Sequence, residues 1–388
     1  MENKQSKEGQ SAEWISTWSR FIRQKPLSHA SQQETGSDII EQVLEAIQQG
    51  DSCISASSEQ AETLNDLVVS VADIEQQIAP FVFDEQRLYL YRYWALEQSL
   101  AQQVARLKQQ KIAAVDISAY PHLLTDEHQI QALSMVAKQG LNIITGGPGT
   151  GKTYTLARII ALLNQAMPNI RIAMAAPTGK AAQRMKEALQ NSLNDEKLQD
   201  LVTDELKQLN PITIHRLLGL GSNAQPRFHA QQALPYDVIV VDEASMLDLS
   251  LANMLLSAVP DHARVILLGD ADQLAAVDVG SVLADLQQVP ALAENRVHLR
   301  NSRRFKQGAL IGKMAQFIQA QQPNQNAAAL LEKFAEQVVH PSEIKSIALT
   351  AEMEDQIQLE YLPKNSAKPV DWMPYYDKLI LGYQHYIE

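Results

Sequence analysis

A glycine-rich run near the middle of the chain has the residue types that bind phosphate. Its members are Gly146, Gly147, Pro148, Gly149, Thr150, Gly151, Lys152 and Thr153. An apolar stretch over 141–144 precedes the run, and a helical pattern over 154–163 follows it. Glycines let successive backbone N–H groups point at a phosphate, beside a helix N-terminus whose dipole favours negative charge. The run therefore predicts a nucleotide-binding loop, in which Lys152 reaches the β and γ phosphates and Thr153 offers its hydroxyl to Mg²⁺. A glycine turn that merely starts a helix is the structural alternative.

Two adjacent carboxylates follow another apolar stretch, 238–241. They are Asp242 and Glu243. A carboxylate at the carboxyl end of a strand lies where a parallel sheet binds its ligands. We therefore predict that Asp242 holds Mg²⁺ and that Glu243 polarises the attacking water. The alternative is an acidic pair that caps a helix.

A neutral amide, Gln273, comes shortly after a third apolar stretch, 265–268. An amide can hydrogen-bond a γ-phosphate or its water without changing the charge of the site. Gln273 is therefore a candidate sensor of ATP against ADP. A Gly-Asp turn with a helix cap would explain the same residues without function.

Two further segments carry groups that suit a sugar-phosphate backbone. Thr178 and Lys180 follow the apolar stretch 170–175, and Thr213 and His215 stand together farther along. Hydroxyls, helix N-termini and basic groups are the usual contacts to such a backbone. On their own, both segments are also ordinary helix starts.

The elements that must position these groups alternate along the chain. Between about 116 and 306, β-rich apolar stretches alternate with amphipathic helical ones, which predicts an α/β domain whose parallel sheet is covered on both faces. Residues 1–115 predict a mostly helical domain with two short strands around 81–91. That domain has no catalytic constellation, which suits a structural or partner-docking module. Residues 307–388 predict the start of a further helical region.

Composition limits the classes of protein that remain. The 388 residues have room for two or three domains, and the single cysteine, Cys53, cannot form an internal disulfide. No apolar run approaches the roughly 20 residues that span a bilayer, so we expect a soluble, cytoplasmic protein with no membrane contact. The net charge of −12 argues against a surface that coats nucleic acid indiscriminately, but it allows a local basic groove.

The order of the segments resembles a known family. GGPGTGKT, APTGKAA, TIHRLLG, VDEASM, GDADQL and the run 302–305 follow one another as in superfamily 1 helicases of the RecD type, the alpha subunit of exonuclease V, or RecBCD. The resemblance implies a RecA-like P-loop motor domain that uses ATP and Mg²⁺. It also implies 5′-to-3′ DNA unwinding in double-strand-break repair and homologous recombination. The implied partners are single-stranded DNA and the beta and gamma subunits of exonuclease V.

The resemblance also implies roles for individual residues. Lys152 and Thr153 would bind the ATP phosphates and Mg²⁺, with Asp242 as the metal carboxylate, Glu243 as the base and Gln273 as the link between ATP state and DNA. The implied contacts to single-stranded DNA are Thr178, Lys180, Thr213 and His215. Gln129 stands where the family often has an adenine-reading glutamine, although a solvated helix residue fits equally well. Arg304 corresponds to the arginine that approaches the γ-phosphate; its neighbour Arg303 replaces a usual aromatic, so which arginine acts stays open.

The sequence departs from the family after Arg304. Residues 307–388 contain neither the second DNA-contacting segment nor a later arginine. This predicts a partial chain that ends before a second motor domain, and that binds Mg-ATP with little DNA-stimulated hydrolysis. The alternative is an ATP-binding fragment with a structural, partner-docking role. An unrelated P-loop ATPase acting on another substrate is the third possibility, which the motif order disfavours.

Overall fold

The computed structural model describes most of the first 300 residues and short parts of the rest. The described residues are 14–22, 37–120, 122–221, 225–270, 273, 278–300, 313–314, 317–318, 326–336, 373, 376–377, 379–380 and 383. By its contacts the chain divides into two compact units, Met1–Ser302 and Arg303–Glu388. The boundaries expected from the sequence, at 115/116 and 306/307, stay predictions. Arg303 and Arg304 lie outside the described residues.

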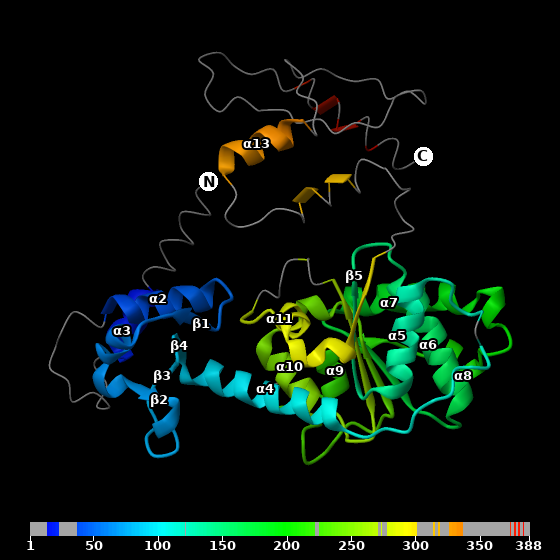
Figure 1. The fold of residues 1–388 in the computed structure, drawn as a ribbon, viewed down its shortest axis with the longest axis horizontal. Coiled ribbons are helices and arrows are strands. Elements are labelled where there is room, and N and C mark those ends of the chain that lie inside the picture. The colour runs from blue at the N-terminus through cyan, green and yellow to red at the C-terminus, as the bar shows by residue number, and fades with distance from the viewer. Residues whose placement is uncertain are drawn as a thin grey trace. The chain divides into compact units, whose positions relative to one another are not determined.

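A six-stranded parallel sheet is the centre of the first unit (Figure 1). Its strand order is β10-β5-β9-β8-β6-β7. The strands are β5 (Leu141–Gly146), β6 (Ile172–Ala176), β7 (Ile212–Thr213), β8 (Val238–Val241), β9 (Arg264–Gly269) and β10 (Arg296–Leu299). The four apolar stretches identified in the sequence are therefore neighbouring strands, and the predicted α/β fold is confirmed. We call residues 116–300 the sheet domain.

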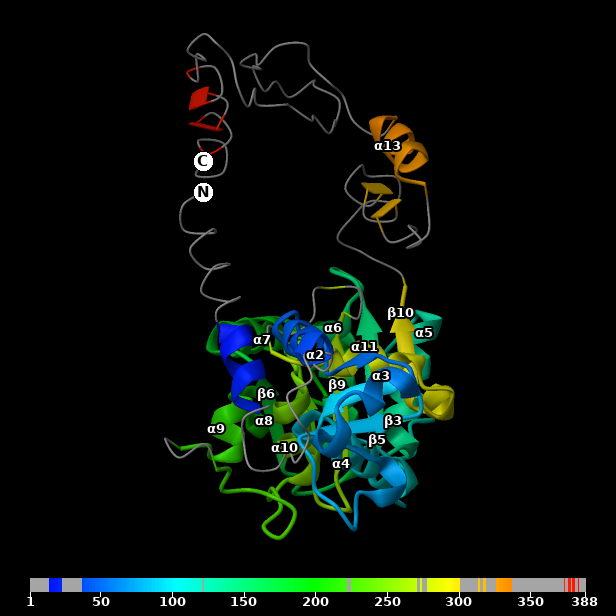
Figure 2. The ribbon, with the colours of Figure 1, turned by 90° about the vertical axis from the view of Figure 1, so that its left-hand side faces the viewer.

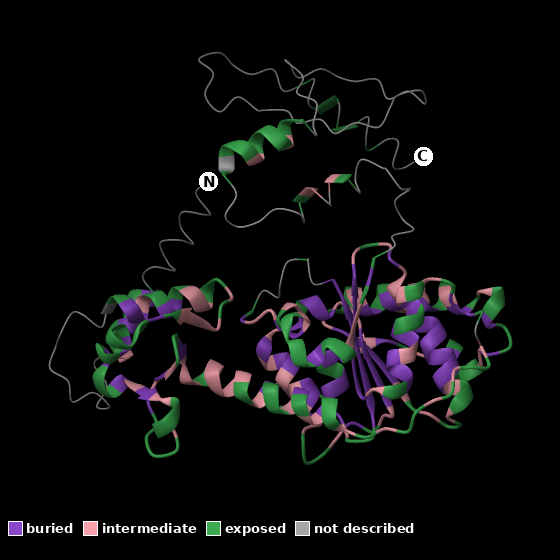
Figure 3. Cartoon of the chain, in the orientation of Figure 1, coloured by how far each residue is buried: buried purple, intermediate pink, exposed green. Residues whose placement is uncertain are grey.

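Helices cover both faces of this sheet, and Figure 3 shows its strands buried between them. Alternate strand residues face opposite ways: Ile143 packs in one core with α9, α10 and α11, and Ile144 packs in the other with α5, α6 and α7. The α-helices are α5 (Glu127–Lys138), α6 (Lys152–Ala166), α7 (Gly179–Leu193), α8 (Asp204–Lys207), α9 (Ile214–Leu218), α10 (Leu249–Ser257) and α11 (Val282–Gln288). Short 3₁₀ turns are η4 (Glu196–Leu198), η5 (Ala244–Met246) and η6 (Pro290–Asn295).

The N-terminal region, residues 14–22 and 37–109, combines helices with a small sheet of order β1-β4-β3-β2. Its strands are β1 (Cys53–Ser55), β2 (Val68–Ser70), β3 (Phe81–Asp84) and β4 (Arg87–Leu90). Its other elements are a helix over 14–22, α2 (Ser37–Gln48), α3 (Ser58–Glu62), η2 (Asn65–Leu67), η3 (Val71–Asp73) and α4 (Tyr91–Gln109). The helices and the β3-β4 hairpin agree with the sequence, and the sheet adds β1 and β2.

Helix α4 connects this region to the sheet domain, as Figure 2 shows from the side of the N-terminal region. It packs along α10 through a shared core that includes Leu100, Val104 and Leu107. Arg106 stabilises the contact between α4 and α10, because its guanidinium donates to the carbonyls of Leu256 and Val259 at the C-terminal end of α10. A cation suits that end of a helix, where carbonyls lack helical partners.

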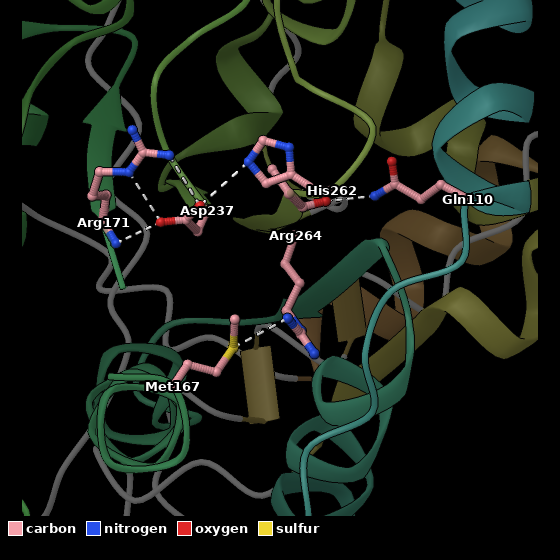
Figure 4. A network of polar contacts seen from close by, with 7 residues as sticks. Gln110, Met167, Arg171, Asp237, His262 and Arg264 are labelled. Atoms are coloured by element: carbon pink, nitrogen blue, oxygen red, sulfur yellow. Dashed lines mark hydrogen bonds and ion pairs between the residues drawn. The ribbon is translucent and has the colours of Figure 1, made fainter. Parts of the chain in front are cut away.

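Polar side chains join the amino ends of β6, β8 and β9, at the opposite edge of the sheet from the predicted site (Figure 4). Asp237 accepts hydrogen bonds from the backbone and guanidinium of Arg171, and His262 Nε2 lies 3.3 Å from the same carboxylate. Arg264 is fully buried, and its guanidinium donates to backbone carbonyls, among them those of Val136 and Ala113. Because a buried cation without partners would be costly, these bonds hold α5 and the segment that contains Ala113, between α4 and α5, against β9.

The second unit is described over short stretches. Asn326 caps the start of α13 (Ala327–Ala335), where its side chain accepts from the N–H of Ala328. Residues 313–314 and 317–318 are also helical, within the helical pattern that the sequence predicts. Among the described residues of both units, no helix has the length and apolarity needed to cross a bilayer.

Candidate nucleotide and nucleic-acid site

The glycine-rich run forms a tight loop between β5 and α6. Gly149 and Gly151 have φ of 80° and 86°, which glycine adopts without strain. The hydroxyl of Thr150 donates to the carbonyl of Gly147 (2.9 Å) and closes the loop from inside. A Cβ on Gly146 would lie 2.6 Å from Thr150 Oγ1, so the loop needs glycine there as well. The loop therefore has the strand, turn and helix that a phosphate site requires.

Lys152 begins α6 and folds back over this loop. Its Nζ donates to the carbonyls of Gly146 (2.5 Å) and Gly147 (3.3 Å). No side chain caps the start of α6, so the ammonium group lies beside the uncapped N-terminus of this helix. That combination attracts a phosphate.

Parallel strands bring the other predicted groups to the same edge. β9 lies between β5 and β8, and Thr145 is in register with Gly269. The carboxyl ends of these strands lead into the phosphate loop, the Gln273 segment and the Asp242-Glu243 pair. Lys152 is close enough to Asp242 to lower that carboxyl's pKa. The structure therefore brings the loop lysine within electrostatic range of Asp242.

The carboxyl group of Asp242 has a raised pKa. Burial raises the pKa of this carboxyl to about 6, and the charge of Glu243 adds to the rise. Two effects lower this pKa: the hydrogen bond from the backbone N–H of Glu243 and the positive charge of Lys152. Taking the charged carboxylate out of water costs stability unless a cation is near. A Mg²⁺ ion would supply that cation.

This shift predicts a pH-dependent stability. Without nucleotide or Mg²⁺, the native carboxyl holds its proton up to about pH 6, whereas the unfolded one loses it near pH 4, so the wild-type chain loses stability as the pH rises between these values. Asp242→Asn keeps the acceptor oxygen and removes the charge. We expect this variant to be more stable than wild type by about 1 to 3 kcal/mol at pH 7.5, with the difference shrinking towards pH 5. Thermal unfolding at several pH values measures it; a pH-independent difference would contradict the assignment.

Glu243 has an unusual backbone. Its φ of 52° lies in the left-handed region, which a residue other than glycine rarely adopts. Such strain costs on the order of 1 kcal/mol and is found most often where function requires a particular direction of the side chain. The carboxylate sits immediately before η5 and beside Asp242, where a general base for water would be needed.

Gln129 is buried rather than solvated, with 3% of its surface exposed. It lies in the first turn of α5, which Asp126 caps, and its Nε2 is 3.4 Å from the carbonyl of Thr150. Among the described residues, its Oε1 has no hydrogen-bond partner. A buried unpaired acceptor beside the phosphate loop fits the recognition of a base amino group. The solvated-helix alternative is therefore wrong.

Gln273 is exposed, and its side chain turns back to Asp270: Nε2 lies 3.2 Å from Oδ2. Asp270 itself is 3% exposed, at the end of β9. Gln273 thus follows the carboxyl end of β9, with its amide bonded within its own turn. Its role as an ATP sensor stays a prediction.

The four predicted DNA contacts lie at the ends of two neighbouring strands. β6 and β7 pair in parallel, with Ala176 opposite Thr213. Thr178 and Thr213 are the N-caps of α7 and α9, and their oxygens accept from backbone N–H groups. Lys180 and His215 are exposed beside them. Both hydroxyls therefore cap helices, which is the structural alternative for these segments. Each hydroxyl can still donate its proton to a ligand.

Two groups beside the loop were missed from the sequence. Arg158, in α6, is fully buried: its guanidinium stacks on Tyr154, 3.3 Å from the ring centroid, and donates to Asp195 (2.6 Å). The spacing of Tyr154 and Arg158, one turn apart, was a usable signal. The second group joins Thr145 Oγ1 to His298 Nδ1 (3.0 Å) and to the amide of Gln287, and these pairs are too far apart in sequence to be foreseen.

The residues present fit a magnesium nucleotide. The loop offers backbone donors and an ammonium group, and Asp242 and Thr153 offer the carboxylate and hydroxyl oxygens that Mg²⁺ prefers. The buried Oε1 of Gln129 and Oγ of Ser245 have no partner within the described part of the chain. Both atoms lie next to the predicted site, where each could form a hydrogen bond with a bound nucleotide.

Comparison with known proteins agrees with this geometry. Residues 129–278 match the model of the AAA domain. The RecBCD enzyme subunit RecD of Mycobacterium tuberculosis is 42% identical over 247 residues, which are 62% of this chain and 42% of that protein. RecD of Haemophilus influenzae is 33% identical, over 64% of this chain and 45% of its own length. The ATP-dependent RecD2 DNA helicase of Deinococcus radiodurans is 38% identical over 44% of this chain and 21% of its own length.

The chain thus spans less than half the length of these relatives. The match to the AAA domain begins at Gln129 and includes both the phosphate loop and the Asp242-Glu243 pair. Over the stretch that it shares with them, the chain is similar to the RecD proteins, and its residues 129–278 match the AAA domain model.

Proposed function

We propose that the chain is an ATP-dependent DNA helicase subunit of the RecBCD type. It would move 5′ to 3′ on single-stranded DNA, in double-strand-break repair and homologous recombination. One observation carries the proposal: neighbouring parallel strands end in a phosphate loop, a carboxylate pair and two exposed basic segments, all at one edge of a single sheet. Nucleotide and DNA would therefore meet on the same rigid element.

Each residue has a part in this proposal. The loop and Lys152 hold the β and γ phosphates, and Thr153 and Asp242 hold the metal. Glu243 takes the proton of the attacking water. Gln273 reports the state of the γ-phosphate towards the DNA edge, the name used here for Thr178, Lys180, Thr213 and His215. Bound Mg²⁺ would neutralise charge on the phosphates and so favour attack. Arg304, outside the described residues, is proposed to approach the γ-phosphate.

The N-terminal region supports a partner-docking role. In the helix over 14–22, Ile15 and Ser19 are buried, whereas Trp14, Trp18 and Phe21 are each more than 40% exposed. The rings of Trp14 and Trp18 lie tilted to each other with centroids 6.4 Å apart, and those of Trp18 and Phe21 meet edge to face at 5.3 Å. Exposed aromatic rows of this kind are typical of protein interfaces. We assign the beta and gamma subunits of RecBCD as the proteins it docks to, in the cytoplasm.

The same surface favours the second candidate function, an ATP-binding chain that is chiefly a structural partner. The two functions differ in whether the DNA edge binds DNA. A salt titration of DNA binding therefore separates them.

Lys180→Ala should weaken the binding of a single-stranded oligonucleotide and lower its salt dependence. One lost phosphate contact reduces the slope of log K against log salt by about 0.7. Fluorescence anisotropy of the labelled oligonucleotide at several salt concentrations measures both effects. Lys207→Ala is the matched control, because Lys207 is exposed in α8, before the amino end of β7. Equal slopes for the two variants would contradict the DNA edge and favour the structural role.

Gln129→Ala should lower the affinity for ATP by about 3- to 10-fold, since one hydrogen bond to the base is lost. Binding of GTP, which lacks the adenine amino group, should change little. Competition with a fluorescent ATP analogue measures both affinities. An equal loss for both nucleotides would mean that Gln129 only supports the loop.

A further inference from the structure

The turn after α2 touches the sheet domain at one backbone bond. Gly50, with φ of 97°, follows the end of α2, and its carbonyl accepts the N–H of Gly280 (2.9 Å). Figure 1 shows this turn reaching from the N-terminal region towards the segment that leads into α11. The bond joins residues that are 230 positions apart, as their numbers show.

The segment around Gly280 is packed tightly against α10. The carbonyl of Val279 accepts the N–H of Leu249, the first residue of α10 (2.9 Å). Gly280 has φ of 104°, and a Cβ there would lie 3.0 Å from the Cβ of Leu249. The segment therefore cannot shift without moving the start of α10, a few residues after Glu243.

Helix α11 continues from this segment to the nucleotide site. Leu283 packs on Gly269 so closely that a Cβ on the glycine would lie 2.5 Å from its Cδ2. The N–H groups of Ala244 and Ser245, which follow the carboxylate pair, border the same glycine. One turn later, the amide of Gln287 donates to Thr145 Oγ1, immediately before the phosphate loop. Helix α11 thus contacts the ends of β5 and β9 and the beginning of η5.

A side-chain bond holds the Gly50 turn in place. Ser52 Oγ donates to Glu97 Oε1 of α4 (2.5 Å), and Glu97 lies within electrostatic reach of Asp285 in α11. The turn is therefore fixed on α4 from one side and on Gly280 from the other.

We infer that residues 278–288 transmit the position of the N-terminal region to the nucleotide site, so that a partner bound to that region would regulate nucleotide binding. This inference rests on the proposed function of the site. A shift of the Gly50 turn would move Gly280, then Leu283 on Gly269 and Gln287 on Thr145. Packed elements of this kind change between discrete arrangements rather than deform smoothly, so a small shift can alter a distant site.

The test loosens the turn with Ser52→Ala in the full chain. Ser70→Ala is the matched control, because Ser70 Oγ also donates to a carboxylate, that of Asp73, within the N-terminal region. Hydrogen exchange without nucleotide and the Kd for Mg-ATP are measured for both. In Ser52→Ala we expect amides of 278–288 to exchange about 3- to 10-fold faster and the Kd to change by a similar factor. Ser70→Ala should change neither.

Linkage requires the reverse effect as well. Adding Mg-ATP to the wild-type chain should change the exchange of amides in residues 49–53, and Gly280→Ala, which acts on the other side of the same bond, should abolish that change. Unchanged exchange at 278–288 in Ser52→Ala overturns the link, and changed exchange with an unchanged Kd overturns the regulation. If the wild-type chain binds no Mg-ATP, the proposed function itself fails, and the inference with it.

Discussion

Replacing Glu243 with glutamine is expected to leave Mg-ATP bound while slowing its hydrolysis by about 10²- to 10⁴-fold. The amide keeps the shape of the side chain but cannot take a proton from water. Glu243 lies beside Asp242 and has a backbone φ of 52°. This position is the structural reason to assign the role of general base to Glu243 rather than to Asp242. Single-turnover hydrolysis gives the rate, and equilibrium binding gives the affinity.

Glu187→Gln is the control for this variant, since Glu187 is an exposed carboxylate on α7 that bonds to Gln183. It should hydrolyse ATP at the wild-type rate. If Glu243→Gln also does so, Glu243 is not the base.

Replacing Lys152 with alanine should weaken Mg-ATP binding by about 10- to 100-fold, because charge-assisted hydrogen bonds to phosphate are lost. Lys152 is the loop's ammonium group and lies over the carbonyls of Gly146 and Gly147. Titration calorimetry measures the affinity. Thermal unfolding should show a folded protein, since the hydroxyl and the N–H of Thr150 both donate to the carbonyl of Gly147 and close the loop without this side chain.

Lys138→Ala, at an exposed position in the last turn of α5, is the matched control and should bind as wild type does. Equal affinities for the two variants would remove Lys152 from the site. A loss of folding in Lys152→Ala alone would mean that the lysine is structural.

Much of the nucleotide site was predictable because its signals are local. The phosphate loop, the carboxylate pair and the strands before them each occupy one short segment, and hydrophobic stretches bounded by turns define the strands. The order of strands was not predictable, because the pairing of β5 with β9 and of β6 with β8 joins segments far apart in sequence. β1 and β2, of three residues each, are too short to give a periodic signal.

Burial decided the points that the sequence left open. The pattern around Gln129 is polar, so nothing in it shows that α5 turns this side chain beneath the phosphate loop. The aromatic row of Trp14, Trp18 and Phe21 is evident from helical spacing, but only the packing of Ile15 shows that the row is the exposed face. Arg158 is likewise an ordinary helix residue until Asp195 is brought to it.

In the function that we propose, one edge of the sheet binds both ATP and DNA and couples their binding. The most direct measurement is the Kd of a single-stranded oligonucleotide for Glu243→Gln, which should hold ATP unhydrolysed, with and without saturating Mg-ATP. We expect ATP to change this Kd by at least about 5-fold, and DNA to change the affinity for ATP by the same factor. A DNA affinity that is identical with and without Mg-ATP would contradict it.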